Sequence, residues 1–216
     1  MRHLPLYQLR VCTMHLKRNL SFLIVVVISI VLVLYIFQNR YTLTALFCQT
    51  LQKQDKAIEN FRIAIKYDPG NTYAYYQLGV IYKEQKDFPN AEHIYLKLLE
   101  IFPDHPYAHY DLGYVYREMK LYDKAMEQYQ RALDIDSQNT YAISDIGYIY
   151  KEQGRYEDAL SQFEKVLAIE PYHKYALWDI AEVYDRMGMK DKAKESYKYY
   201  HEMTECSFRR VWNCFD

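Results

Sequence analysis

Glycine, proline and cysteine are all scarce in this chain. Among 216 residues there are 6 glycines, 6 prolines and 4 cysteines. The glycines form no glycine-rich loop of the kind that cradles phosphate. The cysteines lack metal-site spacing such as Cys-x-x-Cys, and four scattered thiols in a chain of this length do not make a disulfide framework. The composition therefore argues against a nucleotide loop, a zinc site and a disulfide scaffold.

Acidic residues outnumber basic ones beyond the first 40 residues. Residues 1–40 hold five cations and no acid, namely Arg2, Arg10, Lys17, Arg18 and Arg40. Subtracting these five from the 27 basic residues leaves 22 against 28 acids, a net charge of -6 for the rest of the chain. A mildly acidic body is a poor partner for a phosphate backbone, so we expect no nucleic-acid ligand.

Catalytic and cofactor motifs are missing as well. His105, His109 and His173 are single residues, without a His-Glu-x-x-His pattern or partner cysteines. Many acidic residues stand four positions from a lysine on predicted helices, where such pairs are usually solvated. We therefore expect no enzyme activity, no metal and no cofactor.

One long hydrophobic run is present near the N-terminus. Residues 20–37 read LSFLIVVVISIVLVLYIF and carry no charge. As a helix this run would be about 27 Å long, which suits a bilayer core, so we predict a transmembrane helix at 20–37 in contact with membrane lipid, after a basic tail at 1–19. A cleaved signal peptide is the alternative, but the run is longer than usual and Leu43 fits a cleavage site poorly.

The flanking cations predict the orientation of this span. Arg10, Lys17 and Arg18 precede it, whereas only Arg40 follows before Lys53. The more basic side faces the cytoplasm. We therefore expect the N-terminus in the cytoplasm and the remainder of the chain on the non-cytoplasmic side.

The pattern Tyr-Ala-x-x-x-(Leu/Ile)-(Gly/Ala)-x-x-Tyr returns every 34 residues, from Tyr73, Tyr107, Tyr141 and Tyr175. A period of that length is typical of stacked helical hairpins. Other positions keep the same period: Leu78, Leu112, Ile146 and Ile180; Gly79, Gly113, Gly147 and Ala181; Tyr82, Tyr116, Tyr150 and Tyr184; Ala57, Ala91, Ala125, Ala159 and Ala193; Phe61, Tyr95, Tyr129, Phe163 and Tyr197; and Pro69, Pro103 and Pro171.

These residue types suit two helices packed antiparallel. Glycine inside a helix costs about 1 kcal/mol against alanine, so three in register indicate a close crossing. The large aromatic residues would fill the space beside that crossing, and proline would end the second helix of a unit.

The pattern closely resembles the tetratricopeptide repeat family. In residues 72–105 it is met by Tyr75, Leu78-Gly79, Tyr82, Ala91, Tyr95 and Pro103. The resemblance implies an all-α, right-handed superhelical solenoid of antiparallel helix pairs, here preceded by one transmembrane helix. We expect a degenerate first repeat at 38–71, repeats at 72–105, 106–139 and 140–173, a terminal repeat at 174–207, and a capping tail at 208–216.

In this family the first helices line the concave groove, which implies where a partner would bind. One stripe of each first helix then faces the groove. The candidate groove residues are Tyr73, Tyr76, Gln77, Tyr107, Tyr110, Asp111, Tyr114, Arg117, Tyr141, Asp145, Tyr148, Lys151, Tyr175, Trp178 and Asp179. Tyrosine suits such a surface because it offers a large contact area and few rotors to freeze.

Two alternatives remain open for these residues. The tyrosines could serve packing between repeats instead of ligand contact. The aspartates could accept N–H groups of an extended peptide, or could bond a neighbouring helix or a side chain such as Lys83. The family's Lys/Asn/Arg clamp for a terminal carboxylate is absent, because its positions hold residues such as Tyr76, Val80 and Tyr110.

Together these features predict a membrane-anchored protein–protein interaction module that tethers or assembles a complex by holding a protein or peptide segment in a tyrosine-rich groove. A self-associating structural scaffold and a non-catalytic subunit of a membrane enzyme complex are the alternatives.

Overall fold

The computed structural model describes residues 27–33, 35–37, 39–50 and 54–212, with side chains up to Met203 except those of residues 49 and 50. This part of the chain is helical and contains no strand. The chain divides after Ala74 into two compact units, which are described separately.

The first unit contains a helical segment, Val27–Phe37, followed by α2 (Arg40–Thr50) and α3 (Gln54–Tyr67). Helices α2 and α3 pack together over Ala57, Phe61 and Ala64, which are buried. The rings of Tyr41 and Tyr67 stack at a centroid distance of 5.2 Å. A helix pair therefore forms where the degenerate first repeat is predicted.

The predicted membrane span lies only partly within the described residues, since 20–26 and 34 fall outside them. No single described helix is long and apolar enough to cross a bilayer by itself. Val27–Phe37 and Arg40–Cys48 are long and apolar enough to span a bilayer only when taken together, and a bend of 60° separates them.

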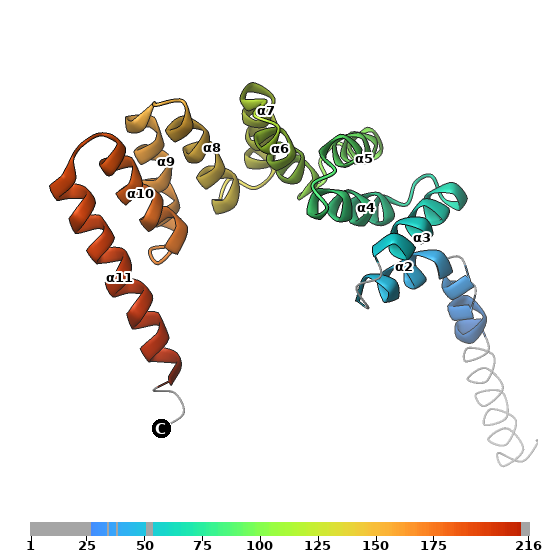
Figure 1. The fold of residues 1–216 in the computed structure, drawn as a ribbon. Helices are drawn as coiled ribbons and strands as arrows, with labels where there is room; N and C mark the ends of the chain where they lie inside the picture. Colours follow the sequence, from blue (N-terminus) through green and yellow to red (C-terminus); the bar gives the residue numbers. More distant parts are fainter. Residues whose placement is uncertain (1–26, 34, 38, 51–53, 213–216) are drawn as a thin grey trace, which may run out of the picture. The chain divides into compact units, whose positions relative to one another are not determined.

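The second unit is a series of helix pairs that extends the periodic pattern to the end of the described chain (Figure 1). Its helices are α4 (Thr72–Glu84, which begins in the first unit), α5 (Phe88–Ile101), α6 (Ala108–Glu118), α7 (Tyr122–Ile135), α8 (Thr140–Glu152), α9 (Tyr156–Ile169), α10 (Lys174–Arg186) and α11 (Lys190–Trp212).

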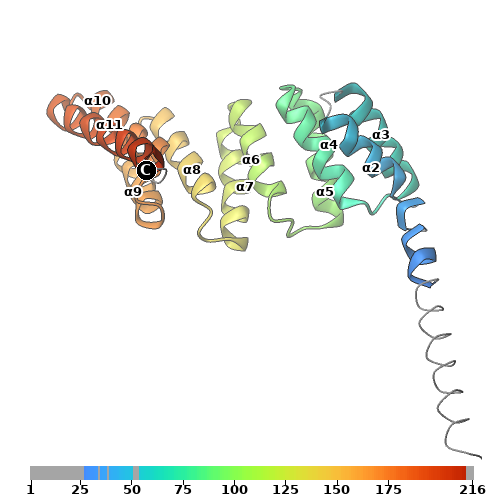
Figure 2. The same ribbon diagram turned by 90° about the horizontal axis from the view of Figure 1, so that it is seen from below.

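From α5 to α11 each helix packs against its neighbours in sequence, and Figure 2 shows α6 to α9 following one another in that order. The pairs α6–α7, α8–α9 and α10–α11 are the hairpins, and α7–α8 and α9–α10 join successive hairpins. The first helices α6, α8 and α10 also contact one another in that order. Contacts between first helices place their side chains on one continuous face.

The glycine column lies where the two helices of a hairpin cross. A Cβ atom added at Gly79 would stand 2.6 Å from Tyr95, and the corresponding distance is 2.7 Å for Gly113 to Tyr129 and for Gly147 to Phe163. Real Cβ atoms do not approach so closely, so any side chain here would push the helices apart. The predicted packing role of these glycines is confirmed.

The aromatic and alanine columns of the second helices form the core. Phe61, Tyr95, Tyr129 and Phe163 are fully buried, as are the alanines one turn before them. The second helices α3, α5 and α9 each end two residues before the prolines of the repeat, as predicted. In the last hairpin, α11 runs without a break through the boundary predicted at residue 208.

The turn between the helices of a hairpin repeats in every pair of the second unit. One residue has positive φ, namely Lys86, Lys120, Gly154 and Gly188, at values of 58° to 76°. The next residue donates its N–H to a carbonyl five positions back, at 2.9 Å in all four turns. This is a helix C-terminus closed by a left-handed residue, and it keeps the two helices of each hairpin antiparallel.

Candidate functional site

Three tyrosines at the start of successive first helices are the most exposed aromatic residues of the repeat face. Tyr107, Tyr141 and Tyr175 expose 61%, 64% and 60% of their surface. Trp178, one turn after Tyr175, exposes 44%. We call Tyr107, Tyr141 and Tyr175 the tyrosine row. Tyr73 occupies the same repeat position in the first unit and is 44% exposed.

Aromatic neighbours from the preceding repeat support two members of the row. The ring centroids of Tyr76 and Tyr107 are 6.1 Å apart, and those of Tyr110 and Tyr141 are also 6.1 Å apart. His105 and His173 stand beside the row at 6.0 to 6.5 Å from Tyr107, Tyr141 and Tyr175. The row is therefore held in place along one edge while its outer surface stays accessible.

Tyr76, Tyr110 and Trp178 form a second, more buried column. Their rings lie 6.4, 5.8 and 5.0 Å from Tyr95, Tyr129 and Tyr197 of the second helices. Burial, assisted by nearby carboxylates, raises the pKa of Tyr76 and of Tyr110. The packing interpretation therefore fits Tyr76 and Tyr110 better than direct ligand contact.

The three aspartates of the predicted groove are bonded within the chain. Lys83 donates to Asp111 and Arg117 donates to Asp145, while Lys151 donates to Asp179 at 2.5 Å. In each case the cation comes from the preceding repeat, 28 residues earlier. We call these three pairs the charge ladder. Of the two sequence alternatives, the intrachain one describes these aspartates.

Asp145 is the most constrained carboxylate of the ladder. Besides the ion pair with Arg117, it accepts a hydrogen bond of 2.8 Å from the Tyr129 hydroxyl. Burial raises the pKa of Asp145, while Arg117 and the Tyr129 hydroxyl act against that rise. A carboxylate so enclosed has a structural role in joining α6 to α8.

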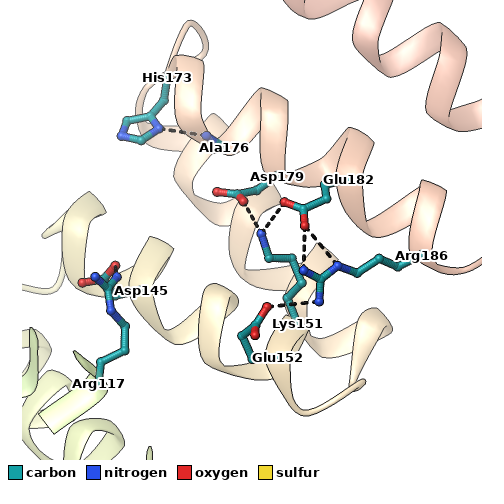
Figure 3. Close-up of polar contacts among 9 residues, drawn as sticks. All are labelled: Arg117, Asp145, Lys151, Glu152, His173, Ala176, Asp179, Glu182 and Arg186. Atoms are coloured by element: carbon teal, nitrogen blue, oxygen red, sulfur yellow. Dashed lines mark hydrogen bonds and ion pairs between the residues drawn. The ribbon is translucent and has the colours of Figure 1, made fainter. Parts of the chain in front are cut away.

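The last rung of the ladder branches into a network (Figure 3). Lys151, only 3% exposed, also donates to Glu182 at 2.7 Å, and Arg186 joins Glu182 to Glu152. Burial lowers the pKa of Lys151, but its two carboxylate partners outweigh burial and the net shift is upward. The bonds from Lys151 and Arg186 lower the pKa of Glu182 by more than its burial raises it.

Tyr114 and Tyr148 receive the same cations on their ring faces. Lys83 and Arg117 lie 5.6 and 4.7 Å from the centroid of Tyr114, and Arg117 and Lys151 lie 5.1 and 5.0 Å from that of Tyr148. Such cation–π contacts add to the ladder. Gln77, at the position of the aspartates in α4, is half-buried.

Columns taken at the 34-residue period do not reveal the charge ladder as a unit, although they leave open a bond from an aspartate to a side chain such as Lys83. Lysine or arginine recurs at 83, 117 and 151 and aspartate at 111, 145 and 179. The offset of 28 residues between opposite charges is six residues shorter than one repeat. This recurring offset is the sequence signal that indicates ion pairs between successive repeats. Glu152, Glu182 and Arg186 carry no such period and could not be found that way.

Metal-ion chemistry finds no support in this arrangement. Within residues 27–212, apart from the gaps named above, no group of three His, Cys, Asp or Glu side chains is placed to hold a metal ion. What the face can offer a partner is exposed aromatic surface, tyrosine hydroxyls and the accessible edges of the charged network.

Four family models match the chain in overlapping segments. Tetratricopeptide repeat models match residues 72–138 and 150–198, a model of YpiA-like C-terminal tetratricopeptide repeats matches 106–173, and a TPR repeat model matches 50–86. Together they run without a gap from residue 50 to residue 198. The chain belongs to the tetratricopeptide repeat family. The family expected from the sequence columns is thus confirmed.

Solved structures share this tetratricopeptide repeat fold. A crystal structure of MamA protein is 23% identical with a TM-score of 0.73, covering 81% of this chain and 95% of that one. YrrB, described as a TPR protein with an unusual peptide-binding site, is 23% identical with a TM-score of 0.65, covering 78% and 90%. PilW, a type IV pilus biogenesis factor, is 22% identical with a TM-score of 0.69, covering 78% of each chain. No match among curated protein sequences was found.

Proposed function

We propose that this chain is a non-catalytic interaction module that binds a protein segment across the tyrosine row. The observation that carries the proposal is the exposure of Tyr107, Tyr141 and Tyr175, each at least 60%, at one repeated position of contacting first helices. Exposed tyrosines held on rigid helices lose little entropy on binding and supply contact area and hydroxyls together.

The charge ladder supports this assignment of roles. It fixes α6 against α8 and α8 against α10 through bonds that need no ligand. A preorganised surface has less ordering to undergo when a partner arrives, which favours affinity. YrrB, whose description names a peptide-binding site, provides a precedent for peptide binding on this fold.

The tyrosine row can be tested by site-specific crosslinking. Benzoylphenylalanine, which resembles tyrosine in shape, would replace Tyr107 or Tyr141 in the full chain in its own membrane. We expect crosslinks to one discrete partner from both positions. Gln130, exposed on the second helix α7, is the matched control position. Equal crosslinking from position 130, or none from 107 and 141, would refute the tyrosine row as the binding surface.

We further propose that residues 20–37 anchor the module in a membrane, with the repeats on the non-cytoplasmic side. The support is the uncharged run of 18 residues and the excess of cations before it. Alkaline phosphatase fused after Asp216 is active only outside the cytoplasm. We expect activity from this fusion, and a matching fusion of a cytoplasmic fluorescent reporter should stay dark. The reverse pattern would overturn the orientation.

A further inference from the structure

The charge of the first helices decides which kind of partner the tyrosine row can receive. Helices α6 and α8 each hold one cation and two carboxylates, and α10 holds two cations and three carboxylates. Every one of these helices therefore carries one negative charge in excess. The face that they share is acidic, although its most buried groups are paired.

The cations of this face are already occupied. Arg117, Lys151 and Arg186 each bind two carboxylates of the chain. Lys174 lies over the ring of Tyr175 at 4.8 Å. A carboxylate from a ligand would have to displace a carboxylate of the chain, and for the largely buried pairs Arg117–Asp145 and Lys151–Asp179 this costs several kcal/mol. An acidic partner is therefore disfavoured.

Two partly exposed carboxylates of the same face each bind one cation only within the described residues, Glu118 the side chain of Arg117 and Glu152 that of Arg186. Glu118 and Glu152 end α6 and α8, and their side chains are 36% and 29% exposed. Each stands eleven residues after a tyrosine of the row, Tyr107 or Tyr141, and eleven residues are three helical turns, so both lie on one face. The negative end of the helix dipole adds to their field.

The chain itself repeatedly places cations on tyrosines of this face. Tyr114, Tyr148 and Tyr175 all have a lysine or arginine over the ring, at 4.7 to 5.6 Å. Tyr107 and Tyr141 are the most exposed members of the tyrosine row and offer their ring faces to a cation from outside.

We propose that the segment bound by the tyrosine row is basic, with lysine or arginine side chains that lie on Tyr107 and Tyr141 and others that reach Glu118 and Glu152, about 16 Å further along α6 and α8. This inference rests on the proposed binding role of the row and names the chemistry of the partner. The occupant is a lysine- or arginine-containing protein segment crossing α6 and α8.

A peptide charge series tests this proposal. Three fluorescein-labelled peptides would each contain five copies of Arg-Gly-Leu, Gln-Gly-Leu or Glu-Gly-Leu. Binding to the full chain in non-ionic detergent would be measured by anisotropy at about 50 mM salt, where charges are weakly screened. We expect the arginine peptide to bind at least about tenfold more tightly than the glutamine peptide, with the glutamate peptide weakest. Binding of the glutamine or glutamate peptide as tight as that of the arginine peptide, or no binding of the latter, would overturn the proposal.

Two charge-matched double variants separate a site from a general field. E118Q/E152Q removes the carboxylates at the C-terminal ends of α6 and α8, while keeping an acceptor oxygen for Arg117 and Arg186. E127Q/E164Q removes two exposed carboxylates from the second helices α7 and α9. We expect E118Q/E152Q to weaken binding of the arginine peptide about fivefold, and the control pair to change that affinity much less. Equal weakening by both pairs would mean unspecific attraction and would reject the basic segment at this site.

The outcomes also separate this inference from the proposed function. If Tyr107→Ser/Tyr141→Ser weakens all three peptides equally and the charge variants change nothing, the tyrosine row binds peptides without a charge preference. If the tyrosine variants change no peptide and positions 107 and 141 give no crosslink, the proposed function itself fails. Circular dichroism and melting of every variant exclude unfolding as the cause.

Discussion

Four side chains cap the first helices α4, α6, α8 and α10, and two of them are histidines. Asn71 and Asn139 accept the N–H of the residue three positions later through Oδ1, at 2.9 and 3.0 Å. His105 and His173 accept it through Nδ1, at 3.1 and 3.2 Å. An imidazole can accept this bond only while Nδ1 is unprotonated, so the cap at His105 depends on pH.

We expect His105 to make the protein less stable in mild acid. Burial lowers the pKa of His105, with Asp111 acting in the opposite direction and His109 in the same one. A histidine whose pKa is lowered by folding stabilises the protein above the unfolded pKa of about 6.5, and that contribution is lost as the pH falls below it. Urea unfolding at pH 7.5 and pH 5.5 measures the loss.

The matched variant for this prediction is His105→Asn, which places at 105 the residue found at 71 and 139. This variant should keep its cap at both pH values and so lose less stability on acidification, by about 1 kcal/mol. Equal losses for the variant and the parent would show that the cap at 105 does not control the acid response.

At the scale of the helical hairpin, the residue that adopts positive φ in the turn is lysine in two repeats and glycine in two, so the conformational free-energy cost of the turn differs between repeats. Lys120 has φ of 60° where Gly154 and Gly188 have 76°. Left-handed backbone costs roughly 1 kcal/mol for a residue with a Cβ atom, whereas glycine adopts it freely. Lys86 is in the same position as Lys120, so two of the four turns carry this strain.

We expect Lys120→Gly to raise the free energy of unfolding by about 0.5–1 kcal/mol. The reciprocal change, Gly154→Ala, should lower it by a similar amount, since no atom lies within 4 Å of the added Cβ and only the backbone conformation opposes it. Chemical denaturation of both variants checks the pair. A loss of stability in both would contradict the strain at position 120.

Sequence alone predicted the hairpins well because their packing is local and periodic. Gly79 and Tyr95, for example, recur with a fixed separation, so the crossing of α4 and α5 could be expected before any coordinates. The ladder was harder, since the pairing of Arg117 with Asp145 depends on how one hairpin stacks on the next. Likewise, Tyr76 and Tyr107 are both predicted groove residues, in different repeat columns, and only the structure separates the half-buried ring from the exposed one. The course of residues 20–26 lies outside the described residues, so the anchor stays a prediction.

Across the whole molecule, the ladder couples hairpins that contact only their neighbours. In such a series, stability is a sum of repeat terms and interface terms, so a weakened interface can let the two sides unfold separately. The bond between Arg117 and Asp145 is the main polar link between α6 and α8 because both side chains are about 15% exposed or less.

We therefore expect Asp145→Asn to destabilise the protein by up to about 3 kcal/mol, since it leaves the mostly buried Arg117 with only the more exposed Glu118 as a charge partner. Hydrogen exchange followed by mass spectrometry should show α6 and α7 opening separately from α10 and α11. The control Glu164→Gln removes one exposed charge from α9 and should leave the exchange pattern unchanged. A uniform change across all helices in Asp145→Asn would argue against coupling through this rung.

The ladder also has a direction, and it stops at α10. Each rung runs from a cation to a carboxylate in the following repeat, but the position that would begin a fourth rung holds Asp185, which bonds Lys190 in its own hairpin. The position that receives each rung holds Leu43 in α2 and Gln77 in α4, and neither side chain carries a charge. A head-to-tail copy would thus meet an aspartate in place of a cation at one end and no carboxylate at the other, so the ladder cannot continue from one chain into the next, as an open fibre of repeats would require.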